Sequence, residues 1–194
     1  MSIKLNGATS GSVELDVPDA IGSDVSGVLL PTAAGTLDRL ERAGNILQVV
    51  QGSTSTVVSV TNEAWTDTGL SATITPTSST SKILVIISQQ CQYYRTNDAN
   101  GVGIRLFRNA TVIDNPPINS QGGLTDYLGI SGSTTINRYL IYSRSVLDSP
   151  GTTNAVTYKT QGRPYLDTNG GYASFQTNAS IDGTSYIQLM EVAA

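Results

Sequence analysis

The sequence predicts an all-β protein: a jelly-roll-like antiparallel β-sandwich head that follows an extended N-terminal anchor segment. Three observations predict this fold class. Short runs rich in Val, Ile, Thr and Tyr recur along the chain, and turn-forming clusters of Gly, Pro, Asn and Ser separate them. No helical pattern alternates with these runs, which is typical of a sandwich or barrel. With 194 residues, the chain is long enough for one domain with a sizeable core and a short extra segment.

The anchor segment comprises residues 1–44, and the head comprises residues 45–194. The anchor holds two short extended runs across a Ser/Gly turn. Its one helical signal is Leu37–Ala43, and Gly44 follows in the C-cap position, where a helix ends. The anchor has too few large apolar side chains to offset the cost of ordering its backbone. We therefore expect neighbouring chains to hold it in place.

Apolar side chains of the anchor are the candidates for contacts with those chains. Leu37 and Leu40 lie three residues apart, so on a helical turn they share one face. Either they meet their copies around a three-fold axis or they cover the base of the head, and both interpretations stay open. The candidate anchor and trimer contacts are Ile3, Leu5, Val13, Leu15, Leu29, Leu30, Leu37 and Leu40.

The head follows a pattern of strand and turn throughout. Ala72 and Ile74 alternate with threonines, as in a strand that is wet on one face. Asn109 can adopt a positive φ, which predicts a tight hairpin turn after Arg108. The predicted strands are Ile46–Val50, Thr56–Thr61, Ser71–Thr75, Lys82–Tyr94, Val102–Arg108, Thr111–Asp114, Thr134–Ser143, Asn154–Gln161, Tyr172–Thr177 and Ser185–Val192.

Two of the predicted strands are apolar on both faces. Ile83–Ile87 does not alternate, and Tyr186–Met190 is interrupted only by Gln188. A strand of an antiparallel sandwich normally faces the core with one side and water with the other. A strand that is apolar on both sides needs a second apolar neighbour, either another subunit or a loop of its own chain. We favour a three-fold subunit interface and expect a homotrimer.

Charge and composition exclude several function classes. Charged residues make up 13% of the chain and its net charge is −4, whereas nucleic-acid binding needs a basic stripe that neutralises phosphates. No apolar run approaches the ~18 residues of a membrane-spanning helix. We expect neither nucleic-acid binding nor membrane insertion.

Residues that support catalysis are scarce. Histidine is absent, which removes the commonest general base and metal ligand. Cys91 is the single cysteine and ends an apolar run, which predicts a small buried residue rather than a reactive thiol. Ser/Gly/Asn-rich loops contain Asp148, Asp167 and Asp182, and these residues lack the spacing of a calcium-binding loop. We expect them to be solvated turn residues. We expect a non-enzymatic protein with no catalytic residues, metal or cofactor.

Tyrosines next to turn clusters are the candidate recognition residues, because tyrosine offers stacking area and a hydroxyl at small entropic cost. For Tyr94, Tyr127 and Tyr165, surface contact and packing are both open. Tyr139, Tyr142, Tyr158, Tyr172 and Tyr186 are expected to pack within strands. The candidate contact loops are Arg95–Gly101, Pro116–Tyr127 and Arg163–Gly171, and the candidate contact residues are Tyr94, Arg95, Asn97, Tyr127, Arg163 and Tyr165.

Several stretches resemble a known family. Lys4–Pro18, followed by Leu29–Thr32, resembles the N-terminal attachment segment of tail-fibre-like proteins from marine and cyanobacterial phages. The β-domain that often follows that segment is similar to Asn45–Val50, Trp65–Pro76 and Ser81–Val85, and its closing strand is similar to Tyr186–Val192. The resemblance implies a trimeric virion appendage with an N-terminal anchor and a C-terminal β-head, and it carries over no catalytic residues.

The sequence and the resemblance together predict a trimeric fibre or spike on the exterior of a phage particle. Residues 1–44 are expected to bind other virion proteins of the tail, baseplate or capsid, and the head is expected to adhere to the host surface, with a surface glycan as candidate ligand. The alternative is a head decoration protein that stabilises the capsid. A depolymerase spike is disfavoured, because the chain is short and its carboxylates are sparse.

Overall fold

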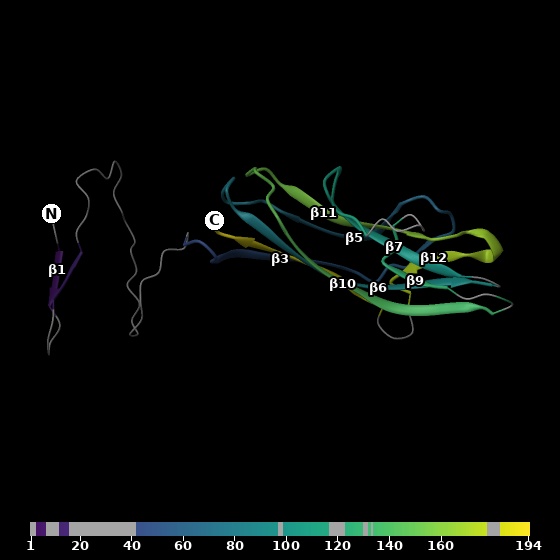
Figure 1. The fold of residues 1–194 in the computed structure, drawn as a ribbon. Coiled ribbons are helices and arrows are strands. Elements are labelled where there is room, and N and C mark those ends of the chain that lie inside the picture. Colours follow the sequence, from purple (N-terminus) through teal and green to yellow (C-terminus); the bar gives the residue numbers. More distant parts are fainter. Residues whose placement is uncertain are drawn as a thin grey trace. The chain divides into compact units, whose positions relative to one another are not determined.

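The computed structural model describes residues 3–6, 12–15, 42–96, 99–116, 123–129, 132, 134–177 and 183–194. They form an all-β structure whose larger part is an antiparallel sandwich of two sheets (Figure 1), so the predicted fold class is confirmed. The chain separates into two compact units, residues 1–38 and residues 39–194.

The described part of the first unit is a two-stranded antiparallel hairpin. Strand β1 (Ile3–Asn6) pairs with β2 (Ser12–Leu15), as the two extended runs predict. The register places Ile3 opposite Leu15 and Leu5 opposite Val13. The remaining candidate contacts of the anchor, Leu29, Leu30, Leu37 and Leu40, lie outside the described residues.

The larger sheet of the second unit has six strands around β6 (Lys82–Arg95). On one side of β6, its first half pairs with β13 (Ser185–Val192) and its second half pairs with β12 (Tyr172–Phe175). On the other side, β10 (Ile136–Asp148) pairs with β6 over all 13 of its residues. The outer strands are β3 (Ile46–Thr54) beside β13 and β4 (Val58–Val60) beside β12.

The smaller sheet has five strands. β11 (Val156–Pro164) lies between β5 (Thr66–Ile74) and β7 (Asn100–Arg108). β7 also pairs with the short strands β8 (Thr111–Asp114) and β9 (Asp126–Leu128). A 3-10 turn, η1 (Thr168–Gly170), precedes β12. Among the described residues no helix is long and apolar enough to cross a membrane.

The core lies between the two sheets and consists of the inward-facing residues of each strand. Because side chains alternate along a strand, every second residue of β5, β6, β11 and β13 is buried. The largest fully buried side chains are Tyr93, Tyr158, Phe175, Leu70, Ile74, Ile83, Ile87, Ile104, Leu106, Ile187, Leu189 and Gln89.

Most predicted strands are present, with different ends. β10 continues to Asp148 rather than Ser143, and β9 was not predicted because only three residues pair. Asn109 forms the predicted turn between β7 and β8 with a φ of 51°. The prediction that Tyr139 and Tyr186 pack within strands is wrong, because they lie on the outward face of the larger sheet and are 57% and 40% exposed.

A buried carboxylate near the end of β13 accepts hydrogen bonds from β3 and from the turn that follows β5. Glu191 is 0% exposed, and its Oε2 accepts a hydrogen bond from Gln48 Nε2 at 2.6 Å. Its Oε1 accepts from the backbone N and from Oγ1 of Thr77, both at 2.7 Å. Burial alone raises the pKa of Glu191, but the hydrogen bonds from Gln48 and Thr77 outweigh burial and lower it to about 2.

We predict that Glu191→Gln lowers the free energy of unfolding at pH 7 by ~1–3 kcal/mol, because an amide nitrogen then faces the groups that donate to the carboxylate. The pKa of Glu191 is lower in the folded state than its ordinary value of 4.5. The carboxylate therefore stabilises the fold above pH 4.5, and this stabilisation disappears as the pH falls toward 2. Urea denaturation at pH 7 and pH 3 should show a smaller loss of stability on acidification for the variant than for the wild type.

The matched control is Glu63→Gln, which removes the same charge from an exposed side chain. This control should stay within ~0.5 kcal/mol of the wild type. Equal stability of Glu191→Gln and wild type at pH 7 would contradict the structural role of Glu191.

Candidate functional site

The outward face of the larger sheet carries an apolar row that crosses four strands. The register places Val49 of β3, Met190 of β13, Leu84 of β6 and Leu147 of β10 opposite one another in sequence across the sheet. Residues opposite one another in antiparallel strands point to the same side. Val49 is 57% exposed and Leu147 is 55% exposed, so in the single chain this row faces water.

Further apolar side chains extend this row along β6 and β10. Ile141 is 64% exposed, the largest fraction among the exposed large apolar residues. We call this surface the apolar face, and its members are Val49, Leu84, Ile86, Tyr139, Ile141, Leu147, Tyr186 and Met190. Taking ~200 Å² for a large side chain, the five most exposed members present on the order of 500 Å². The largest apolar patch on a typical monomer covers ~300–600 Å² and is often a functional surface.

Charge is nearly absent from this face. Of the side chains at outward positions of β3, β13, β6 and β10, only Lys82, at the start of β6, is charged; the others are apolar or carry hydroxyl or amide groups. Depletion of charge together with exposed aliphatic and aromatic residues is typical of the centre of a protein interface. Strand β10 also has no paired strand at its second edge among the described residues. Both features make this side of the sandwich a candidate assembly surface.

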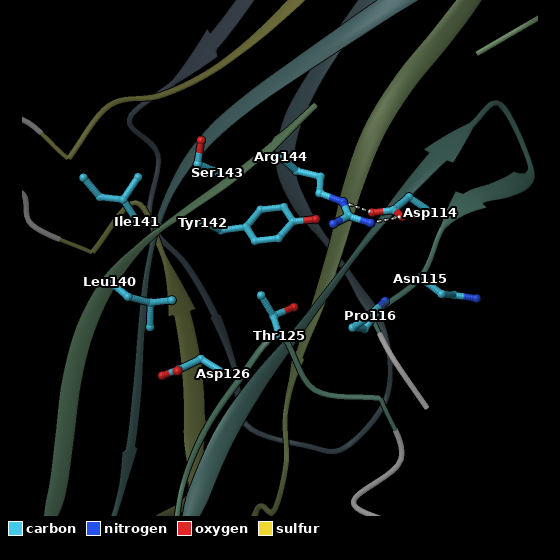
Figure 2. A pocket seen from close by; sticks show the side chains of 10 residues that line it. All are labelled: Asp114, Asn115, Pro116, Thr125, Asp126, Leu140, Ile141, Tyr142, Ser143 and Arg144. Atoms are coloured by element: carbon cyan, nitrogen blue, oxygen red, sulfur yellow. Dashed lines mark hydrogen bonds and ion pairs between the residues drawn. The ribbon is translucent and has the colours of Figure 1, made fainter. Parts of the chain in front are cut away.

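A pocket of about 430 Å³ lies on the inner side of β10, between that strand and the residues that follow β8 and precede β9. Figure 2 shows the Tyr142 ring directed toward the ion pair of Arg144 with Asp114. Arg144 binds both carboxylate oxygens of Asp114, at 2.9 and 2.8 Å. Asp126 accepts from the Tyr93 hydroxyl at 2.8 Å and from Arg138 Nε at 3.0 Å.

The charged groups of this pocket therefore already have partners, either each other or neighbouring side chains. Burial, and then the Asp114 charge, raise the pKa of Tyr142 to about 12, so its hydroxyl is neutral at physiological pH. Among the described residues no group of three or more His, Cys, Asp or Glu side chains is arranged to hold a metal ion. The described lining offers paired charges and a neutral phenol, and it presents no activated nucleophile.

The candidate tyrosines fall on two different faces. Tyr127 and Tyr165 contact each other edge-to-face with ring centroids 5.6 Å apart, and Tyr127 is 40% exposed. Tyr127 lies opposite Gly101, on the outward face of the smaller sheet. Tyr94 instead stacks on Tyr172 at 5.2 Å on the outward face of the larger sheet. The structure thus brings together two of the three tyrosines and separates the third from them.

The structure corrects the prediction for Arg95. Its side chain is not available to a partner, because the residue is 4% exposed. The guanidinium donates to the carbonyl oxygens of Ala99 and Thr168, at 2.6 and 3.1 Å, and to Thr168 Oγ1 at 2.7 Å. Arg95 therefore holds the turn after β6 against the turn before β12.

Arg163 is half-buried and lies beside Trp65, a residue that the sequence analysis did not single out. Its guanidinium lies 5.2 Å from the centre of the Trp65 ring. Asn97 lies outside the described residues.

Comparisons with known proteins leave the chain without an assigned family. No family model matches it, and no curated protein matches it. Among solved structures, the Gt strain of infectious bursal disease virus matches with 14% identity and a TM-score of 0.29 over 97% of this chain and 46% of that chain. A mutant VP2 protein of the same virus in T=1 particles matches with 16% identity and a TM-score of 0.30 over 98% and 44%. The chain spans less than half the length of these proteins, and at such TM-scores the similarity assigns neither fold nor function.

We predict that Cys91 is unreactive in the folded protein. The residue is 1% exposed, its Sγ lies 3.7 Å from the carbonyl oxygen of Leu140, and burial raises the pKa of the thiol to about 12. Because the thiolate is the reacting species, a disulfide reagent at pH 8 should label native protein at least ~100-fold more slowly than urea-unfolded protein. Absorbance of the released thiol measures both rates, and stoichiometric labelling of native protein within minutes would refute the prediction.

Proposed function

We propose that this chain is a non-enzymatic structural subunit of a bacteriophage particle, a homotrimeric fibre or spike appendage on its exterior. Residues 1–44 bind other virion proteins, and the head adheres to the host surface. The observation that carries the proposal is the apolar face, because an exposed apolar patch of this size with almost no charge is typical of the centre of a protein interface. The resemblance of Lys4–Pro18 and Trp65–Pro76 to phage tail-fibre-like proteins supports the assignment to a phage particle.

Copies of the same chain are the occupants that best fit the apolar face. With one lysine at its margin, the face can meet identical faces around a three-fold axis without like-charge repulsion. Its exposed apolar area of ~500 Å² is enough for the centre of an interface that covers ~800 Å² per subunit. The two-sided strands β6 and β13 then have a core on one side and the neighbouring subunits on the other.

This arrangement leaves the smaller sheet facing outward. Its Tyr127–Tyr165 pair is then the candidate host contact, whereas Tyr94 and Tyr172 lie on the face that we assign to the trimer. Three such pairs on each appendage, and several appendages on each particle, turn weak individual contacts into firm adhesion.

We predict that Ile141→Asp converts a trimer into monomers. The side chain is 64% exposed, so an aspartate is solvated in the single chain but brings three like charges together in the trimer. Sedimentation equilibrium should give the mass of three chains for the wild type and of one chain for the variant, with unchanged far-UV circular dichroism. The matched control is Ser71→Asp, an exposed outward position of β5 on the smaller sheet, which should remain trimeric. A monomeric wild type, or a trimeric Ile141→Asp variant, would overturn the trimer assignment.

We predict that Tyr127→Ala and Tyr165→Ala together lower the rate of phage adsorption about tenfold while particles assemble normally, because hot-spot aromatics carry most of the contact energy. Val57→Ala, which truncates another exposed side chain, should adsorb as the wild type does. Adsorption is counted as free phage remaining after mixing with host cells. Unchanged adsorption, together with heads that leak on heating when the gene product is missing, would instead identify the decoration protein.

A further inference from the structure

The outward face of the smaller sheet carries a line in which cations alternate with aromatic rings. Arg105 lies between two rings, with its guanidinium carbon 4.5 Å from the centre of Trp65 and 4.8 Å from that of Phe107. Arg163 lies 5.2 Å from the Trp65 ring, and Lys159 Nζ lies 5.9 Å from the Phe107 ring. We call this set of Arg163, Trp65, Arg105, Phe107 and Lys159 the cation–ring strip.

Strand register brings the strip together from three parts of the sequence. Lys159 and Arg163 lie on β11, opposite Phe107 and Gly103 of β7. Gly103 leaves room for the indole, because a Cβ there would come within 2.9 Å of the Trp65 ring and 2.8 Å of the Gly123 carbonyl oxygen. A bare backbone at position 103 therefore lets Trp65 lie across β7 and reach both arginines.

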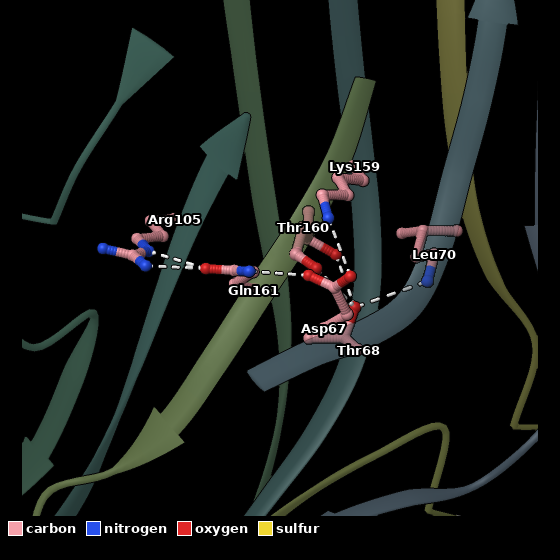
Figure 3. Close-up of polar contacts among 7 residues, drawn as sticks. All are labelled: Asp67, Thr68, Leu70, Arg105, Lys159, Thr160 and Gln161. Atoms are coloured by element: carbon pink, nitrogen blue, oxygen red, sulfur yellow. Dashed lines mark hydrogen bonds and ion pairs between the residues drawn. The ribbon is translucent and has the colours of Figure 1, made fainter. Parts of the chain in front are cut away.

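Positive charge exceeds negative charge in this strip, although the whole chain has a net charge of −4. Asp67 is hydrogen-bonded to the strip and accepts from Lys159 Nζ and from Gln161 Nε2, both at 2.7 Å (Figure 3). Gln161 Oε1 in turn accepts from Arg105 Nε at 3.1 Å and Nη2 at 2.7 Å, which fixes the orientation of the guanidinium.

Repulsion between the two arginines is part of this arrangement. Burial, and then the neighbouring Arg163, lower the pKa of Arg105. An anionic group placed beside both guanidinium groups relieves that repulsion and gains charge-assisted hydrogen bonds. The strip is therefore complementary to a negatively charged ligand, and its two rings add flat apolar area next to the charges.

We propose that the cation–ring strip binds an acidic polysaccharide, with sulfate or carboxylate groups at the three cations and sugar rings against Trp65 and Phe107. The strip extends along the outward face of the sheet and its five side chains are partly exposed, which suits an extended chain rather than a small enclosed ligand. Hydroxyl groups of Ser71 and Thr157 lie on the same face, near Lys159, and can bond to sugar hydroxyls. The net negative charge of the chain disfavours a long nucleic acid, whose affinity depends on many phosphate contacts.

This inference deepens the proposed adhesion by naming the class of ligand, and its biological meaning rests on that proposed function. By strand alternation, Tyr127 lies on the same outward face as the strip, opposite Gly101 of β7. An acidic chain bound to the strip can therefore continue toward the Tyr127–Tyr165 pair.

The test uses Trp65, the only tryptophan of the chain, as a reporter within the strip. The full chain is titrated with dextran sulfate, alginate, neutral dextran and a short DNA duplex while tryptophan emission is followed. The sulfated or the carboxylated polymer should change the emission with saturation, at an affinity that falls as salt is added. Neutral dextran should leave the emission unchanged, and DNA should bind at least ~10-fold more weakly than the better polysaccharide.

Two variants with the same change of charge test the assignment to residues. Arg163→Gln should weaken binding of the better polysaccharide about five- to tenfold. Arg144→Gln, whose side chain is 51% exposed on β10 outside the strip, should bind within about twofold of the wild type. Lys159→Gln serves as a second strip variant if Arg163→Gln does not fold.

Three outcomes would overturn the inference: no saturable emission change with either polyanion, equal weakening by Arg144→Gln and Arg163→Gln, or DNA bound as tightly as the polysaccharide.

Failure of this inference is distinguishable from failure of the proposed adhesion. Loss of adsorption in the Tyr127 and Tyr165 variants, with no polyanion binding by purified protein, rejects only the ligand class. Polyanion binding by the strip with normal adsorption of those variants rejects only the tyrosine contact.

Discussion

The pairing of β6 on both of its edges is the constraint on which the rest of the structure depends. This 14-residue strand binds β10 along one edge and both β12 and β13 along the other, so most strands of the larger sheet meet at it. Its inward residues Ile83, Val85 and Ile87 are 0% exposed and form the middle of the core. Each edge of β6 satisfies backbone groups that would otherwise be buried without partners. Removing β6 would therefore separate the strands that carry the apolar face and take away the middle of the core on which the smaller sheet packs.

The two outer faces of the sandwich differ in their side chains. On the larger sheet, Leu84 and Ile86 continue the apolar pattern outward, and their neighbours on β10 and β13 bring almost no charge. On the smaller sheet, the outward positions of β7 and β11 hold arginine, lysine, glutamine and aromatic residues. An uncharged apolar face suits permanent contact with identical subunits, whereas a charged face suits a reversible ligand. The proposed trimer and the proposed polysaccharide site thus occupy opposite sides of one domain.

Much of the fold could be predicted because it depends on local pattern. Alternation predicted β5, and runs that are apolar on both faces predicted β6 and β13, the latter interrupted only by Gln188. The φ of 51° at Asn109 matches the turn expected there. Candidate contact residues were harder to predict, since a side chain's surroundings depend on strands far away in sequence. Arg95 begins a predicted contact loop and was itself a candidate contact residue, yet its side chain is buried and donates to the carbonyl oxygens of residues 99 and 168. Trp65 and Arg105 form part of the strip through a strand pairing that no local signal reveals.

By itself, the sequence determined the all-β class, most strand positions and the scarcity of catalytic chemistry, because these follow from residue type and from spacing along the chain. Only the tertiary structure decided which strands are neighbours and in which register. That choice placed Val49, Met190, Leu84 and Leu147 in one row, and it placed Arg105 between two rings. The physical reason is that the face on which a side chain lies follows from its own strand. Its neighbours across the sheet follow instead from pairing between segments that lie far apart in the sequence, as Val192 of β13 does from Ile46 of β3.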